Sequence, residues 1–390
     1  MRSRLRLVVL GMLGRFPFAG HAWVYLNWLR GLSGLGHEVW YVEDDSVWPY
    51  DPIQNTVTDD CSYALRHVAG CLDSIGLGER WAFRLADREG ACWGLSPAKL
   101  DALYSGCDAL INLQGGTDLR DPHMRAPLRV YLQSDATTSE LRLANGDEHT
   151  RRAFADHHVM VTYGENYGAA DCGVPTNGVR YLKTRQPVDL ELWPAVYTPE
   201  ARFFSTIGNY RQAGNDVEYR GDVYRWSKHH EWEKVIDLPR HTRQRFELAL
   251  GLDDDRDREM LEKHGWGVRQ PLPMSLEVFG AYPGFIRESR AEFTVAKDQN
   301  VRLRSGWFSD RDACYLASGK PVVAQDTGFS NVLPTGRGLF AFSSQEEALQ
   351  AIEAVNADYS TQCLAARRLA EEHFEARAVA DRFIRSVGLG

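Results

Sequence analysis

One segment of the sequence gathers cations around a predicted helix start. In residues 297–329, Ser309 and Asp310 are good N-cap residues for a helix expected to begin at Arg311. The first amides of a helix have no intrahelical acceptor and favour a negatively charged ligand. Four basic side chains lie close enough in sequence to neutralise it, namely those of Lys297, Arg302, Arg304 and Arg311. The segment predicts a diphosphate site, although a simple helix cap with ion-paired cations is the plainer alternative.

Two short polar stretches follow predicted buried strands. They are Asp326, Thr327 and Gly328 after the strand 321–325, and Gly208 and Asn209 after the strand 202–207. Ligands of open α/β sheets bind beyond the carboxyl ends of the strands. A carboxylate accepts hydrogen bonds from hydroxyls, and a glycine permits close approach. We expect these residues to contact the same ligand, with ordinary turns as the alternative.

Aromatic residues accumulate after the first predicted helix, and most have the helical or strand spacing of core residues. Trp48 and Tyr50 differ, because they lie in a proline-containing loop. Their rings are suited to stacking on a sugar or an aromatic ligand.

The elements that position these residues alternate along the chain. Apolar strand-like runs are expected at 5–12, 38–42, 109–113, 130–133, 159–162, 179–182, 202–207, 246–250, 293–295, 321–325 and 338–342. Helical patterns fall at 21–35, 223–237, 257–263, 276–288, 311–316 and 345–355, with two further helices in 362–387. This alternation predicts an α/β architecture with mostly parallel sheets.

The chain has 390 residues, which suits two domains. The proline-containing stretch 186–200 reads as the connection between them. We predict an N-terminal domain over residues 1–196, a C-terminal domain over 197–372, and a final helix in 373–390 that packs back towards the first domain.

Composition and motifs exclude several classes of protein. A net charge of -8 without a basic cluster disfavours a nucleic-acid partner, and no apolar run is long enough to span a bilayer. Seven scattered cysteines and no cleavable leader suggest the cytoplasm, and no His or Cys spacing suggests a metal site. The first loop, GMLGRFPFAG, lacks the GxGxxG of dinucleotide-binding folds, and no P-loop motif is present.

The stretch SGWFSDRDACYLASGKPVVAQDTG resembles the donor-binding region of GT-B glycosyltransferases, with the step from Ala317 to Val323 and then Asp326 to Gly328 carrying the likeness. HAWVYLNWLRGLSGLGHEVWYV, with its GHEV step at Gly36 to Val39, is similar to the opening unit of many such enzymes. The resemblance covers the whole chain. It implies two Rossmann-like, doubly wound domains facing across a cleft.

The same resemblance implies an enzyme that moves a hexosyl group from a nucleoside diphosphate donor to a hydroxyl acceptor without a metal or other cofactor. UDP is the commonest nucleotide in the resembling families. The donor-binding residues would be Gly208, Asn209, Lys297, Arg304, Ser309, Asp310, Arg311, Asp312, Asp326, Thr327 and Gly328, and Trp48 and Tyr50 would contact the acceptor. The resemblance to plant-type enzymes implies that His21 is the base. Asp135 could orient it, with Glu165 as the competing carboxylate, and the alternative is that His21 caps the helix or binds phosphate.

The sequence departs from both resembling subfamilies. Cys314 occupies the position of the ribose-binding glutamate of glycogen-synthase-like enzymes, and Gly306 occupies the preceding position of their paired-glutamate motif. Arg304 stands at the histidine of the plant-type HCGWNS motif. Two alternatives therefore stay open, a nucleotide-sugar 2-epimerase of the same fold and an inactive nucleotide-sugar-binding protein.

Overall fold

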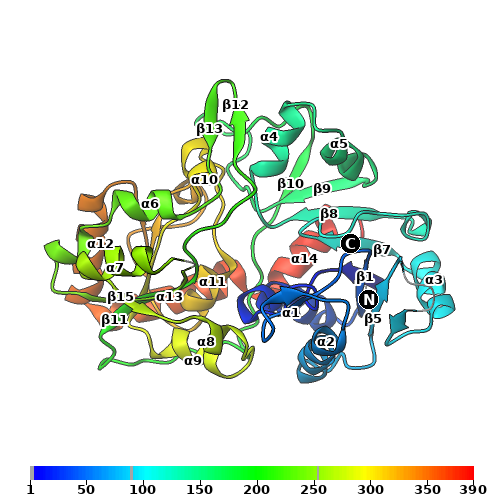
Figure 1. Ribbon diagram of the computed structural model, residues 1–390, viewed down its shortest axis with the longest axis horizontal. Helices are drawn as coiled ribbons and strands as arrows, with labels where there is room; N and C mark the ends of the chain where they lie inside the picture. Colours follow the sequence, from blue (N-terminus) through cyan, green and yellow to red (C-terminus); the bar gives the residue numbers. More distant parts are fainter. Residues whose placement is uncertain (1–3, 88–90, 253) are drawn as a thin grey trace.

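The structure is a computed structural model that describes residues 4–87, 91–252 and 254–390. Two α/β domains lie side by side, one around each of two large sheets (Figure 1). The predicted doubly wound architecture is confirmed. Within the described residues, no helix is both long enough and apolar enough to cross a bilayer.

The first domain is built on an eight-stranded sheet in the order β10-β9-β8-β7-β1-β2-β5-β6, parallel except for the β5–β6 pair. Its strands are β1 (Arg6–Leu10), β2 (Glu38–Asp45), β5 (Trp81–Leu85), β6 (Cys92–Trp93), β7 (Ala109–Leu113), β8 (Arg129–Gln133), β9 (Val159–Thr162) and β10 (Tyr181–Lys183). Its helices are α1 (Ala19–Gly34), α2 (Ser62–Ser74), α3 (Pro97–Gly106), α4 (Thr138–Ala144) and α5 (Glu148–Ala155). Helices cover both faces, which explains the nearly continuous apolar runs of β1 and β7.

The second domain is built on a six-stranded parallel sheet in the order β15-β14-β11-β16-β17-β18. Its strands are β11 (Phe203–Asn209), β14 (Arg245–Gly251), β15 (Gly267–Arg269), β16 (Ala291–Thr294), β17 (Val322–Gln325) and β18 (Leu339–Phe342). Its helices are α6 (His229–Lys234), α7 (Asp255–Lys263), α8 (Leu272–Ser275), α9 (Ala281–Glu288), α10 (Asp298–Leu303), α11 (Asp310–Ala317), α12 (Gln345–Ala357) and α13 (Tyr359–Leu369). Phe246, Trp266 and Phe293 pack ring against ring in its core.

The chain passes between the domains twice, and the two crossings are hydrogen-bonded to each other. The Val188 amide donates to the Phe374 carbonyl, and the Ala376 amide donates to the Val188 carbonyl. The last helix, α14 (Ala376–Ser386), then packs on α1, where Trp28 meets Phe383 at a ring distance of 5.1 Å. A Cβ atom on Gly31 of α1 would lie 2.5 Å from the Ala376 carbonyl oxygen, so only glycine permits this approach. The predicted domain limits at 196 and 372 stay a prediction.

Most predicted elements are present with limits that differ by a few residues. The helix predicted over 223–237 is wrong. Residues 222–224 form β13, which pairs with β12 (Val217–Tyr219) in a hairpin, and the helix covers only 229–234. The helix predicted over 276–288 is shorter than expected, because only 281–288 is helical (α9), and a separate short helix, α8, precedes it at 272–275. The sequence reading also missed a second hairpin, β3 (Tyr50–Asp51) with β4 (Thr56–Val57), which follows β2.

Candidate active site

Two adjoining cavities lie at the carboxyl ends of the strands of the second domain. The smaller, of about 210 Å³, is lined by the ends of β11, β14 and β16 and by the start of α11. The larger, of about 620 Å³, shares Gly208, Asn209 and Gln212 with it and extends to Phe16, Phe18 and His21 of the first domain. The larger cavity is therefore walled by both domains.

The smaller cavity collects basic side chains. Lys228, Lys297 and Arg311 all line it, together with Ser309 at the start of α11. Ser309 caps α11 as predicted, because its Oγ accepts a hydrogen bond from the Arg311 amide at 3.2 Å. The structure thus brings together five of the predicted donor-binding residues around one space, namely Gly208, Asn209, Lys297, Ser309 and Arg311.

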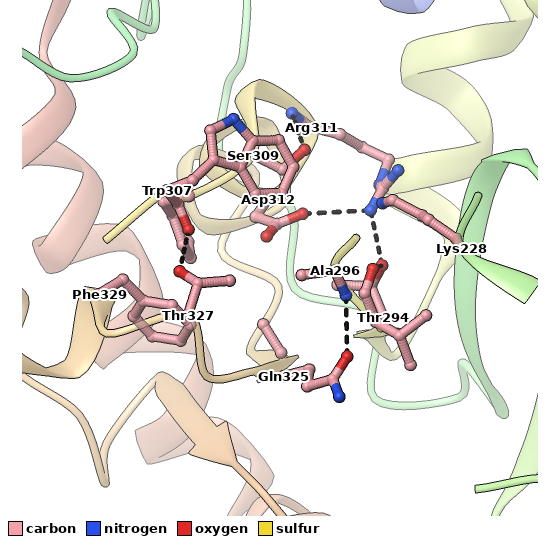
Figure 2. A pocket seen from close by; sticks show the side chains of 13 residues that line it. Lys228, Thr294, Ala296, Trp307, Ser309, Arg311, Asp312, Gln325, Thr327 and Phe329 are labelled. Atoms are coloured by element: carbon pink, nitrogen blue, oxygen red, sulfur yellow. Dashed lines mark hydrogen bonds and ion pairs between the residues drawn. The ribbon is translucent and has the colours of Figure 1, made fainter. Parts of the chain in front are cut away.

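Arg311 is held by the protein itself (Figure 2). Its guanidinium is ion-paired with Glu292 and Asp312, and it donates to the Ile207 carbonyl at 2.9 Å and to the Thr294 hydroxyl at 2.8 Å. Burial raises the pKa of Glu292, and the arginine opposes that shift. With four of its five N–H groups engaged, Arg311 contributes positive charge to the cavity wall rather than a free fork for phosphate oxygens.

Lys228 is the cation that the sequence reading did not single out. It lies just before α6, and its Nζ is 5.7 Å from the centre of the Trp307 ring. Burial lowers the pKa of Lys228 to about 7, and the charges of Arg311 and Lys297 act in the same direction. An anion in the cavity would oppose both effects and favour the charged ammonium.

Lys297 and Asp135 form an ion pair that joins the two domains. The Nζ of Lys297 lies 2.5 Å from Asp135 Oδ2 and 2.9 Å from the centre of the Trp226 ring. The predicted pairing of Asp135 with His21 is therefore not formed. Asp135 follows β8, at the carboxyl end of the first sheet, and faces the loop between β16 and α10.

Three of the predicted donor-binding residues lie in a different contact between the domains. Arg304 pairs with Asp171 at 2.7 Å and with Asp326 at 3.3 Å, and Asp326 Oδ1 accepts from the Gly328 amide. A Cβ atom on Gly328 would lie 2.9 Å from the side-chain nitrogen of Asn166. Arg304, Asp326 and Gly328 line neither of the two cavities in the described part of the chain. Their positions indicate that they hold the domains together.

The remaining predicted donor-binding residues surround α11. Asp312 and Thr327 line a third, much smaller space beside Lys228 (Figure 2). The Oδ1 atom of Asp310 is buried and has no hydrogen-bond partner among the described residues. Burial, with the neighbouring carboxylates of Asp312 and Asp135, raises the pKa of Asp310 to about 7.

The departures from the paired-glutamate motif have a physical reason at one position. Gly306 has a φ of +80°, and a Cβ atom there would lie 2.3 Å from the backbone nitrogen of Asn166. No side chain fits at this contact between the domains. Cys314 is buried in α11, and burial raises the pKa of its thiol well above the usual range. Neither cavity is lined by Cys314 in the described part of the chain.

His21, in the first turn of α1, faces the larger cavity from the first domain. Its Nε2 lies 2.9 Å from Gln114 Oε1, which also accepts a hydrogen bond from the Tyr25 hydroxyl. Because this amide oxygen is an acceptor, Nε2 carries the proton and Nδ1 carries the lone pair. Nδ1 has no hydrogen-bond partner among the described residues, and burial lowers the pKa of His21 to about 4. The ring is therefore neutral at pH 7 with a lone pair on Nδ1, and burial disfavours its protonated form.

The loop before α1 is fixed by a buried carboxylate. Glu43 of β2 accepts hydrogen bonds from the amides of Gly14 and Arg15 and from the Tyr41 hydroxyl. Burial raises the pKa of Glu43 to about 7. This side chain, which the sequence reading did not consider, sets the path of the chain that enters α1.

The structure also places the other residues predicted in the first domain, namely Glu165, Trp48 and Tyr50. Glu165 pairs with Arg185 at 2.7 Å and lines neither cavity in the described chain. Trp48 is exposed, and the Tyr50 ring lies 5.7 Å from that of Phe18, which lines the larger cavity.

Gln114 and Lys228 are functional candidates that sequence reasoning missed. Gln114 ends the β7 strand in the left-handed region, with φ of +67°, and a non-glycine residue held there is common at functional sites. Its place after a predicted buried strand was the available signal. The sequence held no such signal for Lys228, because it lies within the stretch 223–237 that was predicted to be one continuous helix.

Across residues 4–87, 91–252 and 254–390, no cluster of three or more His, Cys, Asp or Glu side chains is placed to hold an ion. The expected metal independence stays a prediction.

The chain has the GT-B fold. The HepE protein of Anabaena, solved with UDP and glucose, superposes with a TM-score of 0.56 over 98% of this chain and 99% of that chain, at 13% sequence identity. AviGT4, a glycosyltransferase involved in avilamycin A biosynthesis, gives a TM-score of 0.54 over 98% and 97%, at 13% identity. A sucrose-phosphate synthase of Thermosynechococcus elongatus gives 0.55 over 98% of both chains, at 10% identity. No family model and no curated protein sequence matches the chain.

Proposed function

We propose that the protein is a glycosyltransferase that moves a hexosyl group from a UDP-sugar to a hydroxyl acceptor. One observation carries the proposal. Three cations, those of Lys228, Lys297 and Arg311, line a cavity that adjoins a larger one reaching a neutral histidine on the opposite domain. This arrangement suits a donor whose leaving group gains negative charge and an acceptor that must lose a proton.

The donor diphosphate would lie in the smaller cavity. Lys228, Lys297 and the first amides of α11 would stabilise the charge that develops on the leaving phosphate, without a metal ion. Uridine is favoured because HepE, which has the same fold, was solved with UDP and with UDP-glucose.

His21 would receive the acceptor proton on Nδ1 as the acceptor oxygen attacks the anomeric carbon. Gln114 would keep the imidazole in the required tautomer through its contact with Nε2. A base held in this way typically contributes a factor of about 10² to 10⁴ to the rate.

The test is a panel of nucleoside diphosphates and their sugars, with binding measured by calorimetry and turnover by release of free nucleotide. UDP-glucose should bind, and release of UDP should depend on an added hydroxyl compound. Lys228→Met should weaken UDP binding by about tenfold or more, since a hydrogen bond to a charged group contributes about 1.5–3 kcal/mol. Lys263→Met, on the exposed side of α7, is the matched control.

Each other outcome selects a different function. A changed sugar configuration without any acceptor would indicate the 2-epimerase. Binding without turnover across all acceptors would indicate the inactive sugar-nucleotide-binding protein. If no nucleoside diphosphate binds, the proposal is wrong.

A further inference from the structure

The first domain exposes a cluster of large apolar side chains next to the larger cavity. Val47, Trp48, Ile53 and Val57 all lie on or beside the β3–β4 hairpin, and Ile53 and Val57 are 67% and 58% exposed. Isolated exposed apolar residues need no explanation, but a contiguous group indicates a binding surface.

Val57 of this group is connected to the cavity through the rings of Tyr50 and Phe18. Tyr50 and Val57 are directly opposite each other in the β3–β4 pair, so their side chains share one face of the hairpin. The Tyr50 ring contacts that of Phe18, and the Phe16 ring meets His21 edge-on at 5.7 Å. Phe16 and Phe18 both line the cavity. We call this row, Val57, Tyr50, Phe18 and Phe16, the apolar track.

The track is held in a fixed position relative to His21. The Tyr50 amide donates to the Arg15 carbonyl at 3.0 Å, and Arg15 is ion-paired with Asp45 at 3.0 Å. The amide of Arg15 is in turn bound by Glu43. The hairpin and the loop that leads into α1 therefore form one hydrogen-bonded unit.

Charge restricts what can lie on the track. Residues 46–60 contain Asp51, Asp59 and Asp60 but no lysine or arginine, and the nearby Arg15 is already paired with Asp45. These carboxylates disfavour an anionic lipid surface and any acceptor that carries a phosphate or carboxylate near its apolar part.

We propose that the acceptor is a neutral or cationic hydroxyl compound with an aromatic or otherwise apolar body. The inference rests on the proposed function, since it assigns the acceptor of that reaction. The hydroxyl would enter the cavity beside His21, and the body would lie along the apolar track on the hairpin.

The experiment uses three probes with matched chemistry. 2-Naphthol carries a hydroxyl on a neutral aromatic body, 6-hydroxy-2-naphthoic acid adds a carboxylate, and glycerol has hydroxyls without an apolar body. Binding to the full chain, with and without saturating UDP, is followed by calorimetry. We expect 2-naphthol to bind more tightly than either of the others.

A double variant, Ile53→Ser with Val57→Ser, removes the apolar side chains at the hairpin end of the cluster. It should weaken 2-naphthol binding by about tenfold, as expected for loss of two partly buried aliphatic groups, and leave UDP affinity unchanged. Leu364→Ser, at a side chain 63% exposed on α13 of the other domain, is the matched control and should change neither.

The outcomes separate the inference from the proposed function. If UDP binds but the double variant and the wild type bind 2-naphthol equally, or if neither binds it, the inference is overturned and the proposed function stands. Variant-sensitive sedimentation with phosphatidylglycerol vesicles would indicate a membrane surface instead, and a variant-sensitive dimer would indicate a second copy of the chain. Failure of UDP to bind would overturn the proposed function and with it the acceptor role, and variant-sensitive 2-naphthol binding would then leave only an apolar binding surface.

Discussion

The two domains contribute chemically different walls to the cavities between them. On the second domain, Arg311 and Lys297 are already paired with Glu292 and Asp135, so positive charge is fixed in place by neighbours. On the first domain, the wall is aromatic, and its one imidazole keeps an unpartnered nitrogen. The difference indicates that one wall is organised for an anion and the other for proton transfer to a mostly apolar partner.

The largest expected effect is on turnover, when His21 of the first-domain wall is replaced. His21→Ala should lower turnover by about 10²- to 10⁴-fold with nearly unchanged UDP-glucose affinity, because it removes the proton acceptor and no cation. His149→Ala, at a side chain 73% exposed, is the control in the same domain. Near-normal turnover with lost donor affinity would show that His21 is a phosphate ligand. Normal turnover and normal donor affinity would show that its role is only structural, at the start of α1.

A second prediction tests whether the second-domain wall is structural. Arg311→Ala leaves Glu292 buried without its partner, and loss of one member of a buried pair costs about 3–5 kcal/mol of folding free energy. Urea unfolding measures this loss, and the double variant Glu292→Gln with Arg311→Met should recover part of it. Arg256→Ala, in a pair whose arginine is 88% exposed, should change little. Full stability with weakened UDP binding would instead assign Arg311 to the donor.

A third prediction uses the protonation of Lys228. Its pKa of about 7 means that the charged form decreases as pH rises above 7, so UDP-glucose affinity should be constant below that pH and fall above it, by at most about tenfold per pH unit. UDP-glucose is the suitable ligand because its diphosphate diester does not titrate in this range. Lys228→Arg stays charged, so its affinity should fall less with rising pH, with only the ionisation of Asp310 left to change it in this range. Identical pH profiles for the two proteins, measured by calorimetry, would remove Lys228 from the donor site.

Local signals explain why parts of both walls could be predicted from the sequence. Ser309 and the start of α11 follow from capping preferences, and the strand that ends with Gly208 and Asn209 follows from its apolar run. Both depend on neighbours within a few residues. The fold class followed from the alternation of such elements.

The rest depends on contacts between distant parts of the chain. Arg311 was expected to bind phosphate, but its partner Glu292 lies on a different element, the strand β16. Asp135 was expected beside His21, but the arrangement of the domains places Lys297 next to Asp135 and Gln114 next to His21. No spacing in the sequence reveals which of several nearby acids and bases will pair across a cleft.

The smallest expected effect concerns the ion pair that joins the two walls. Asp135 competes with a donor phosphate for Lys297, so Asp135→Asn should tighten UDP-glucose binding slightly. Because the Asp135 side chain is 37% exposed, the pair contributes about 0.2–1 kcal/mol, which limits the gain to less than about fivefold. Lys297→Met should weaken UDP-glucose binding. Opposite changes in affinity in the two variants would indicate that Asp135 competes with phosphate for Lys297, whereas a purely structural ion pair would give changes of the same sign. Turnover reduced at least tenfold with unchanged donor affinity in Asp135→Asn would show instead that the carboxylate acts with His21 once substrates are bound.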